Sequence, residues 1–161
     1  MTDLTEQQQK FQQQREKQHK ELKIQKEIRQ VEDDLVIAIE KILKDENSCK
    51  NLEKSQYRNL MHVADTTDST EVIKNFLRYQ LGRDNKWGEG KNSLALQIID
   101  DIDNLLKNKA QEIVEKVKYS DKFKIVWLEL TRRYLGYGSR RLKYLKPDKD
   151  NSYRNTNQKV N

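Results

Sequence analysis

The chain has 161 residues, which suits one domain, and its charged fraction of 36% exceeds its hydrophobic fraction of 34%. One proline, five glycines and one cysteine argue against many short strands and exclude an intramolecular disulfide or a zinc cage of cysteines. The sequence lacks the roughly 20 consecutive apolar residues of a membrane span and the apolar run of a signal peptide, so we expect a cytoplasmic protein.

Positive charge is concentrated near the end of the chain. The net charge is +6, and residues 131–161 alone hold nine Lys or Arg against two Asp or Glu. Lys and Arg beside phosphates gain affinity by releasing counterions, so this distribution predicts a polyanionic partner. A basic tail that is only solvated is the simpler alternative.

The first half of the sequence predicts an extension followed by a long helix. Residues 1–20 contain seven glutamines, and we expect a disordered or frayed helical extension that contributes little to the core. Beyond it, two sets of apolar residues recur every seven positions, offset by four, which predicts one helix from about Glu21 to Asp45. The sets are Ile24, Val31 and Ala38, and Ile28, Leu35 and Ile42.

Four more amphipathic helices are predicted downstream. We expect Ser55, Ser93 and Ser120 to cap the second, fourth and fifth of the five helices. Gly82 fits the C-cap of the third, and Gly136 with Gly138 is expected to end the fifth. These segments predict an all-α protein, a compact antiparallel bundle of about five helices over residues 21–145 with a polar flexible tail over 146–161.

Catalytic patterns are scarce. His62 has no nucleophile near it in the sequence, so a surface histidine is favoured over a general base. Asp100, Asp101 and Asp103 lack a spaced set of further metal ligands and fit the charged outer face of a helix. We therefore expect a protein that is not an enzyme and needs no cofactor or metal. A small metal-dependent nuclease is the least favoured alternative.

Binding to nucleic acid is better supported, because basic residues alternate with aromatic ones near the end of the chain, and such side chains hold phosphates and stack on bases. Tyr134 is expected in the core, whereas Tyr137 is the better candidate for an exposed ring. Trp87 is expected to be either an anchor between subunits or a lid on the core. The predicted RNA-binding residues are Arg58, Lys74, Arg78, Arg83, Lys86, Arg132, Arg133, Tyr137, Arg140, Arg141 and Lys143.

Two segments resemble a known family. "LEKSQYRNL" (Leu52–Leu60), followed by "FLRYQLGRD" (Phe76–Asp84), is similar to paired signatures of the small helical subunit of type III CRISPR effector complexes, the Csm-type small subunit. The similarity covers about residues 50–135 in pattern and order; the Gln-rich start, the "DNKWGEGK" loop and the basic, Tyr-rich end depart from it. The matching positions are Ser55, Gln56 and Arg58, then Tyr79, Gly82 and Arg83.

The resemblance implies a non-catalytic subunit whose copies stack along the effector complex, touch its other subunits and contact the backbone of guide RNA and target RNA. Such a subunit offers Arg and Lys to phosphates and does not read bases. The alternative from the residues alone is a protein-interaction adaptor whose long helix pairs with a partner helix.

Overall fold

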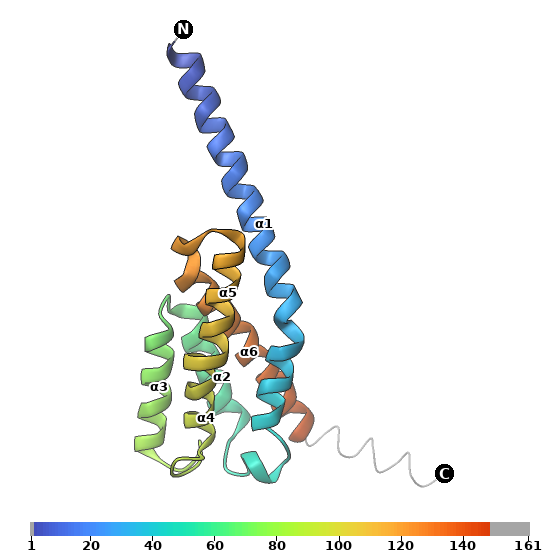
Figure 1. The fold of residues 1–161 in the computed structure, drawn as a ribbon. Helices are drawn as coiled ribbons and strands as arrows, with labels where there is room; N and C mark the ends of the chain where they lie inside the picture. The colour runs from blue at the N-terminus through green and yellow to red at the C-terminus, as the bar shows by residue number, and fades with distance from the viewer. Residues whose placement is uncertain (1, 149–161) are drawn as a thin grey trace, which may run out of the picture.

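The structure is a computed structural model that describes residues 2–148, and this part of the chain is helical without any strand (Figure 1). The predicted all-α class is confirmed. The π-helical segment η2 joins α4 to α5, so that these three elements form one rod and the bundle has five rods in total among the described residues. The elements are α1 (Thr2–Ile42), η1 (Asn47–Cys49), α2 (Lys54–Thr66), α3 (Thr70–Arg83), α4 (Leu94–Asp101), η2 (Ile102–Leu106), α5 (Lys107–Val117), η3 (Ser120–Lys122) and α6 (Phe123–Leu145).

Successive rods run up and down, so α1 and α6, the first and the fifth, run in the same direction (Figure 1). α6 occupies the centre and packs against α1, α2 and α5. Apolar side chains from every rod form one continuous core. Its fully buried members include Ile28, Leu35, Ile39, Leu60, Ile73, Leu77, Ile98 and Leu130.

The long first helix begins much earlier than predicted. The seven-residue pattern placed its start near Glu21, whereas α1 begins at Thr2 and projects beyond the bundle (Figure 1). The side chains of residues 3–19 are exposed, and Ile24 is the first buried residue. The apolar pattern therefore predicted where α1 joins the core and not where the helix starts.

Helix caps were predicted with mixed success. Ser93 caps α4, since its hydroxyl accepts a hydrogen bond from the Leu96 amide at 3.3 Å. Glu53, and not Ser55, is the N-cap of α2; its backbone amide donates to the side chain of Gln56 at 3.3 Å. Gly82 does not end α3, which continues through Arg83.

Gly136 and Gly138 do not end α6, which runs on to Leu145. Gly138 is instead a place of close approach. A Cβ atom there would lie 2.0 Å from the hydroxyl oxygen of Tyr57, and that hydroxyl donates to the Leu135 carbonyl at 2.7 Å. The glycine makes room for a tyrosine from α2, so the expected break was wrong for a reason that lies in another helix.

Both tryptophans belong to the core. Trp87, in the loop between α3 and α4, is fully buried and stacks on Tyr57 with ring centroids 5.8 Å apart. Of the two roles expected for Trp87, its burial therefore supports a lid on the core and not an anchor between subunits. Trp127 is buried on α6 as predicted. Its indole N–H donates to the Ile102 carbonyl at 2.8 Å, at the start of the π-helical segment, where the wider turn changes the backbone pairing.

Candidate nucleic-acid interface

Two arginines of α6 bind the ends of other helices. Arg132 donates from Nε to the Ala64 carbonyl and from Nη2 to the Thr67 carbonyl, each at 2.8 Å. The last carbonyls of a helix have no partner within it, and a cation is favoured beside them. Arg132 thus caps α2 and is only part-exposed, so the prediction that it is free to bind RNA is not supported.

Arg141 binds the backbone just beyond the end of α1. Its Nε donates to the Leu43 carbonyl at 2.9 Å and its Nη2 to the Lys44 carbonyl at 2.7 Å. Lys146 continues the pattern one turn later, donating to the Lys50 and Leu52 carbonyls at 3.1 Å and 2.7 Å. Part of the positive charge near the end of the chain is therefore used to hold α6 against the backbone of residues 43–52. Residues 149–161, the rest of the predicted tail, lie outside the described residues.

Arg133 and Lys74 are also engaged inside the molecule. Arg133 pairs with Glu32 of α1 and, at 2.9 Å, with Glu129. Burial would lower the pKa of Lys74, but hydrogen bonds to Asp103 at 2.6 Å and to Glu71 at 2.7 Å raise it above its usual value.

Lys74 is only 5% exposed and its ammonium lies 5.7 Å from the ring centre of Trp127, so it does not share an outer face with Arg78. The spacing of four residues was compatible with one face. The long Lys74 stem instead turns inward, where Asp103 of η2, Glu71 of α3 and the Trp127 indole of α6 stabilise its charge.

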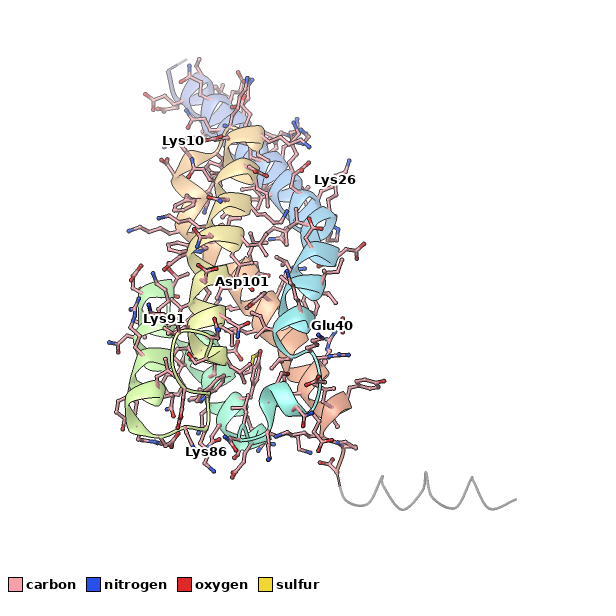
Figure 2. All side chains as sticks on the ribbon, turned by 60° about the horizontal axis from the view of Figure 1, so that its bottom comes forward. Lys10, Lys26, Glu40, Lys86, Lys91 and Asp101 are labelled. Atoms are coloured by element: carbon pink, nitrogen blue, oxygen red, sulfur yellow. The ribbon has the colours of Figure 1, made fainter. Side chains whose placement is uncertain are left out.

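The other predicted residues lie on the surface but do not form one site. Arg78 is exposed on α3, and Arg83 at the end of that helix pairs with Asp84 at 3.2 Å. Lys86, at the bottom of the bundle in Figure 2, pairs with Glu53 at 2.9 Å. This hydrogen bond is the main cause that lowers the pKa of the Glu53 carboxyl. The loop after α3 is thus linked to α2 by charge.

The last turns of α6 present a basic and aromatic surface, which we call the α6 outer face: Tyr137, Arg140, Lys143 and Tyr144. Arg140 and Lys143 are exposed, and neither forms an ion pair or hydrogen bond with another described residue. The Arg140 guanidinium lies 5.9 Å from the centre of the Tyr137 ring. Tyr144 is 75% exposed, and Arg141 lies 5.4 Å from its ring centre.

A shallow groove of about 300 Å³ runs beside this face, between α6 and α1. Val36 and Glu40 form its α1 side, and the two tyrosines with their arginines form the other. Burial raises the pKa of the Tyr137 hydroxyl, with a smaller contribution from the Glu32 charge. Glu40, labelled in Figure 2, lines this groove from α1, so an acidic group limits the positive surface there.

On the opposite side the face continues toward α2. Arg58 is exposed on α2, and its charge and that of Lys143 both act on the Asp148 carboxylate. The pKa of Asp148 is lowered mainly by its hydrogen bond with Lys54. Three basic residues from two helices therefore lie around Asp148 at this end of the bundle: Lys54, Arg58 and Lys143.

The predicted and observed sites overlap in part. Tyr137 is half-buried, so it is a weaker candidate for an exposed ring than Tyr144, which was left out of the predicted set. The signal for Tyr144 was its spacing: positions 137, 140, 141 and 144 follow the i, i+3, i+4, i+7 pattern of one helix face. Ending the helix at Gly138 concealed that pattern.

The residues weighed for catalysis are dispersed. His62 is exposed on α2, Asp103 pairs with Lys74, and Asp101 accepts a hydrogen bond from the Tyr134 hydroxyl at 2.6 Å. Burial raises the pKa of the Asp101 carboxyl, and the hydrogen bond from Tyr134 offsets only part of this effect. Within residues 2–148, no three His, Cys, Asp or Glu side chains gather as they would around a metal ion.

None of the helices described is long and apolar enough to cross a membrane. Comparison with known proteins gives no family model, no curated protein and no solved structure that matches the chain.

Proposed function

We propose that the protein is a non-catalytic subunit of a ribonucleoprotein and holds the backbone of RNA on the α6 outer face. The observation that supports this proposal is the pair Arg140 and Lys143, exposed and unpaired among the described residues, beside the exposed ring of Tyr144. Arg58 of α2 extends the same surface.

The chemistry of this surface suits single-stranded RNA of any sequence. Unpaired cations gain affinity from phosphates by releasing counterions, whereas cations already held in ion pairs gain less. An exposed tyrosine adds stacking of about 1–3 kcal/mol per base, and every base offers a stacking surface. The proposal gives an indirect role to Arg132, Arg133 and Arg141, whose guanidinium groups are held by carbonyls and carboxylates of the protein. They support RNA binding by stabilising the shape of the bundle.

The most specific form of the proposal is that the protein is a small subunit of a type III CRISPR effector complex. In that complex it would bind the backbone of the guide RNA and target RNA beside other subunits. Its support is the pair of sequence signatures around Gln56 and Gly82, together with the helical bundle. Purification of the untagged protein from its native cell would test this form. Co-purification of large subunits with a ladder of short guide RNAs is expected, and isolation of the free protein would contradict it.

The binding surface itself is tested by filter binding over a series of salt concentrations, with two unrelated RNAs. Arg140→Ala and Lys143→Ala should each reduce the slope of log K against log salt by about 0.7, by the same amount for both RNAs. Tyr144→Ala should weaken binding without changing the slope. Arg78→Ala is the matched control, because Arg78 is an exposed cation on α3, on the other side of the bundle from the end of α6 (Figure 1).

Equal slopes for Arg78→Ala and the two α6 variants would contradict the assignment of RNA to this face. A loss confined to one RNA would indicate base recognition, which the proposal does not allow. If RNA binding is absent and a protein partner is found whose affinity is insensitive to salt, the adaptor is the better description, and the exposed part of α1 is the surface that favours it.

A further inference from the structure

One acidic side chain, Glu40 of α1, lines the groove beside the α6 outer face (labelled in Figure 2). Glu40 is half-buried, and its carboxylate forms no ion pair or hydrogen bond with another described residue. Arg140 and Arg141 line the same groove, yet the Arg141 guanidinium donates to the carbonyls of Leu43 and Lys44 instead. The groove beside the proposed RNA surface therefore has an acceptor that the protein itself leaves unused.

The packing of α1 on α6 gives the level of Glu40 along this groove. The two helices run in the same direction (Figure 1). Ile39 of α1 packs at Gly138 of α6, where an added Cβ would lie 2.8 Å from the Ile39 Cγ1 atom. Glu40 is the next residue of α1, so it lies level with the part of α6 between Tyr137 and Tyr144.

A nucleotide bound to the α6 outer face would bring its sugar to this level. Tyr144 offers an exposed ring to a base, and Arg140 lies one helical turn before it, about 6 Å along the axis. The ribose joins the base to the phosphate, so a base on Tyr144 and a phosphate on Arg140 place the ribose between them, beside Glu40. The groove volume of about 300 Å³ is at the small end of ligand sites, which suits one nucleoside.

We infer that Glu40 accepts a hydrogen bond from the 2′-hydroxyl of a ribose in this groove and thereby makes the α6 outer face selective for RNA over DNA. The inference rests on the proposed function. An ionised carboxylate repels phosphates and is favourable beside them only where a donor reaches it. Phosphate and deoxyribose carry no donor, whereas every ribonucleotide supplies the 2′-hydroxyl, whatever its base. Selectivity for the sugar thus agrees with binding that does not depend on sequence.

The first test compares three strands of one sequence by filter binding: RNA, RNA with fluorine in place of every 2′-hydroxyl, and DNA. Fluorine keeps the RNA-like shape of the sugar but cannot donate a hydrogen bond. The native protein should bind RNA about tenfold more tightly than either other strand, because a hydrogen bond to a charged group is worth about that factor. Equal affinity for RNA and the fluorinated strand would overturn the inference.

The second test assigns the selectivity to Glu40. Glu40→Ala removes both the acceptor and the negative charge, so it should strengthen DNA binding and bring the affinities for RNA and the fluorinated strand close to one another. Glu40→Gln keeps an acceptor oxygen and should retain part of the preference. The control is Asp33→Ala, an exposed position outside the groove, two turns earlier and within about 20° of Glu40 around α1. It should leave the preference unchanged.

The outcomes separate this inference from the proposed function. If Arg140→Ala and Lys143→Ala weaken RNA binding but Glu40→Ala leaves the preference for RNA unchanged, the inference is wrong and the proposed function stands. If Glu40→Ala changes the affinity for only one of two unrelated RNAs, Glu40 recognises a base and the inference is overturned. If neither RNA nor DNA binds, the inference and the proposed function both fail.

Discussion

Replacing Gly138 by alanine should destabilise the bundle strongly, although alanine is the better helix former. The added Cβ would lie 2.0 Å from the Tyr57 hydroxyl oxygen, 2.9 Å from its Cζ and 2.8 Å from Cγ1 of Ile39. All of these atoms are in the core, where Tyr57 and Ile39 are 1% and 0% exposed. The ring cannot swing into solvent, so either α2 or α6 must move.

Three effects decide the magnitude. Overpacking a core costs about 1–3 kcal/mol. Displacing the Tyr57 hydroxyl from the Leu135 carbonyl leaves a buried donor without a partner, which costs about 1–3 kcal/mol. Alanine in place of glycine in a helix interior returns about 1 kcal/mol. The free energy of unfolding should therefore fall by about 3 kcal/mol, which lowers the thermal midpoint by about 6–12 °C for a chain of this size.

Gly136→Ala is the matched control, because it makes the same change in the same helix two residues earlier. A Cβ there meets only the Met61 methyl at 3.9 Å, an ordinary contact. This variant should gain about 0.5–1 kcal/mol from helix propensity. Thermal unfolding followed by circular dichroism at 222 nm, with urea titration for the free energies, compares the two variants directly.

Adding Tyr57→Phe to Gly138→Ala removes the closest atom of the clash and should recover part of the loss, so the pair should be strongly non-additive in a double-mutant cycle. If Gly138→Ala is as stable as Gly136→Ala, the close packing of α2 on α6 is wrong. Additive effects of Tyr57→Phe and Gly138→Ala would refute the hydroxyl as the atom that demands the glycine.

Three further predictions concern stability. Asp101→Asn keeps an acceptor for the Tyr134 hydroxyl, and because burial raises the pKa of Asp101, the native protein should lose stability relative to this variant as pH rises above the ordinary pKa of 3.8. Asp101→Ala removes the acceptor and should lower the free energy of unfolding by about 1–3 kcal/mol. Urea titration from about pH 3 to about pH 7 tests both variants, and a stability difference between native and Asp101→Asn protein that does not change with pH would contradict the buried carboxyl. Trp127→Ala should lower the unfolding free energy by about 3–5 kcal/mol, and an unchanged thermal midpoint would show that the indole is dispensable to the core. Deleting residues 1–20 should leave the midpoint at high dilution nearly unchanged because the side chains of residues 3–19 are exposed, and a fall of more than about 8 °C would show that the segment packs on the bundle.

Features that depend on neighbours along the chain were predictable. The seven-residue pattern of α1 located its buried side, and Ser93 was recognised as a cap because the groups that it binds are three residues away. Trp127 and Tyr134 followed from the apolar line on α6, since the side that repeats with the helix period is the side that packs.

Features that depend on distant residues were not predictable from local pattern. Gly138 was interpreted as a helix end because the sequence does not show that Tyr57 fills the space beside it. Arg132 and Arg141 were counted as RNA contacts, but their partners are carbonyls 65–98 residues away. A count of charges does not separate cations that close a fold from cations that remain free, and only the latter, such as Arg140, are available to a ligand.

The central place of α6 has a consequence for how the chain is made. The core side of α1, with Leu35 and Ile39, is covered to a large extent by α6, which is synthesised about one hundred residues later. The carbonyls at the ends of α1 and α2 also gain their hydrogen bonds from Arg141 and Arg132 only when α6 is made. At 5–20 residues per second, a growing chain would expose this apolar surface for about 5–20 seconds before α6 emerges. A ribosome that stalls before α6 is complete would therefore release a chain whose apolar core is exposed to water, which chaperones and proteases recognise. Folding of the bundle thus completes only once α6 has been synthesised.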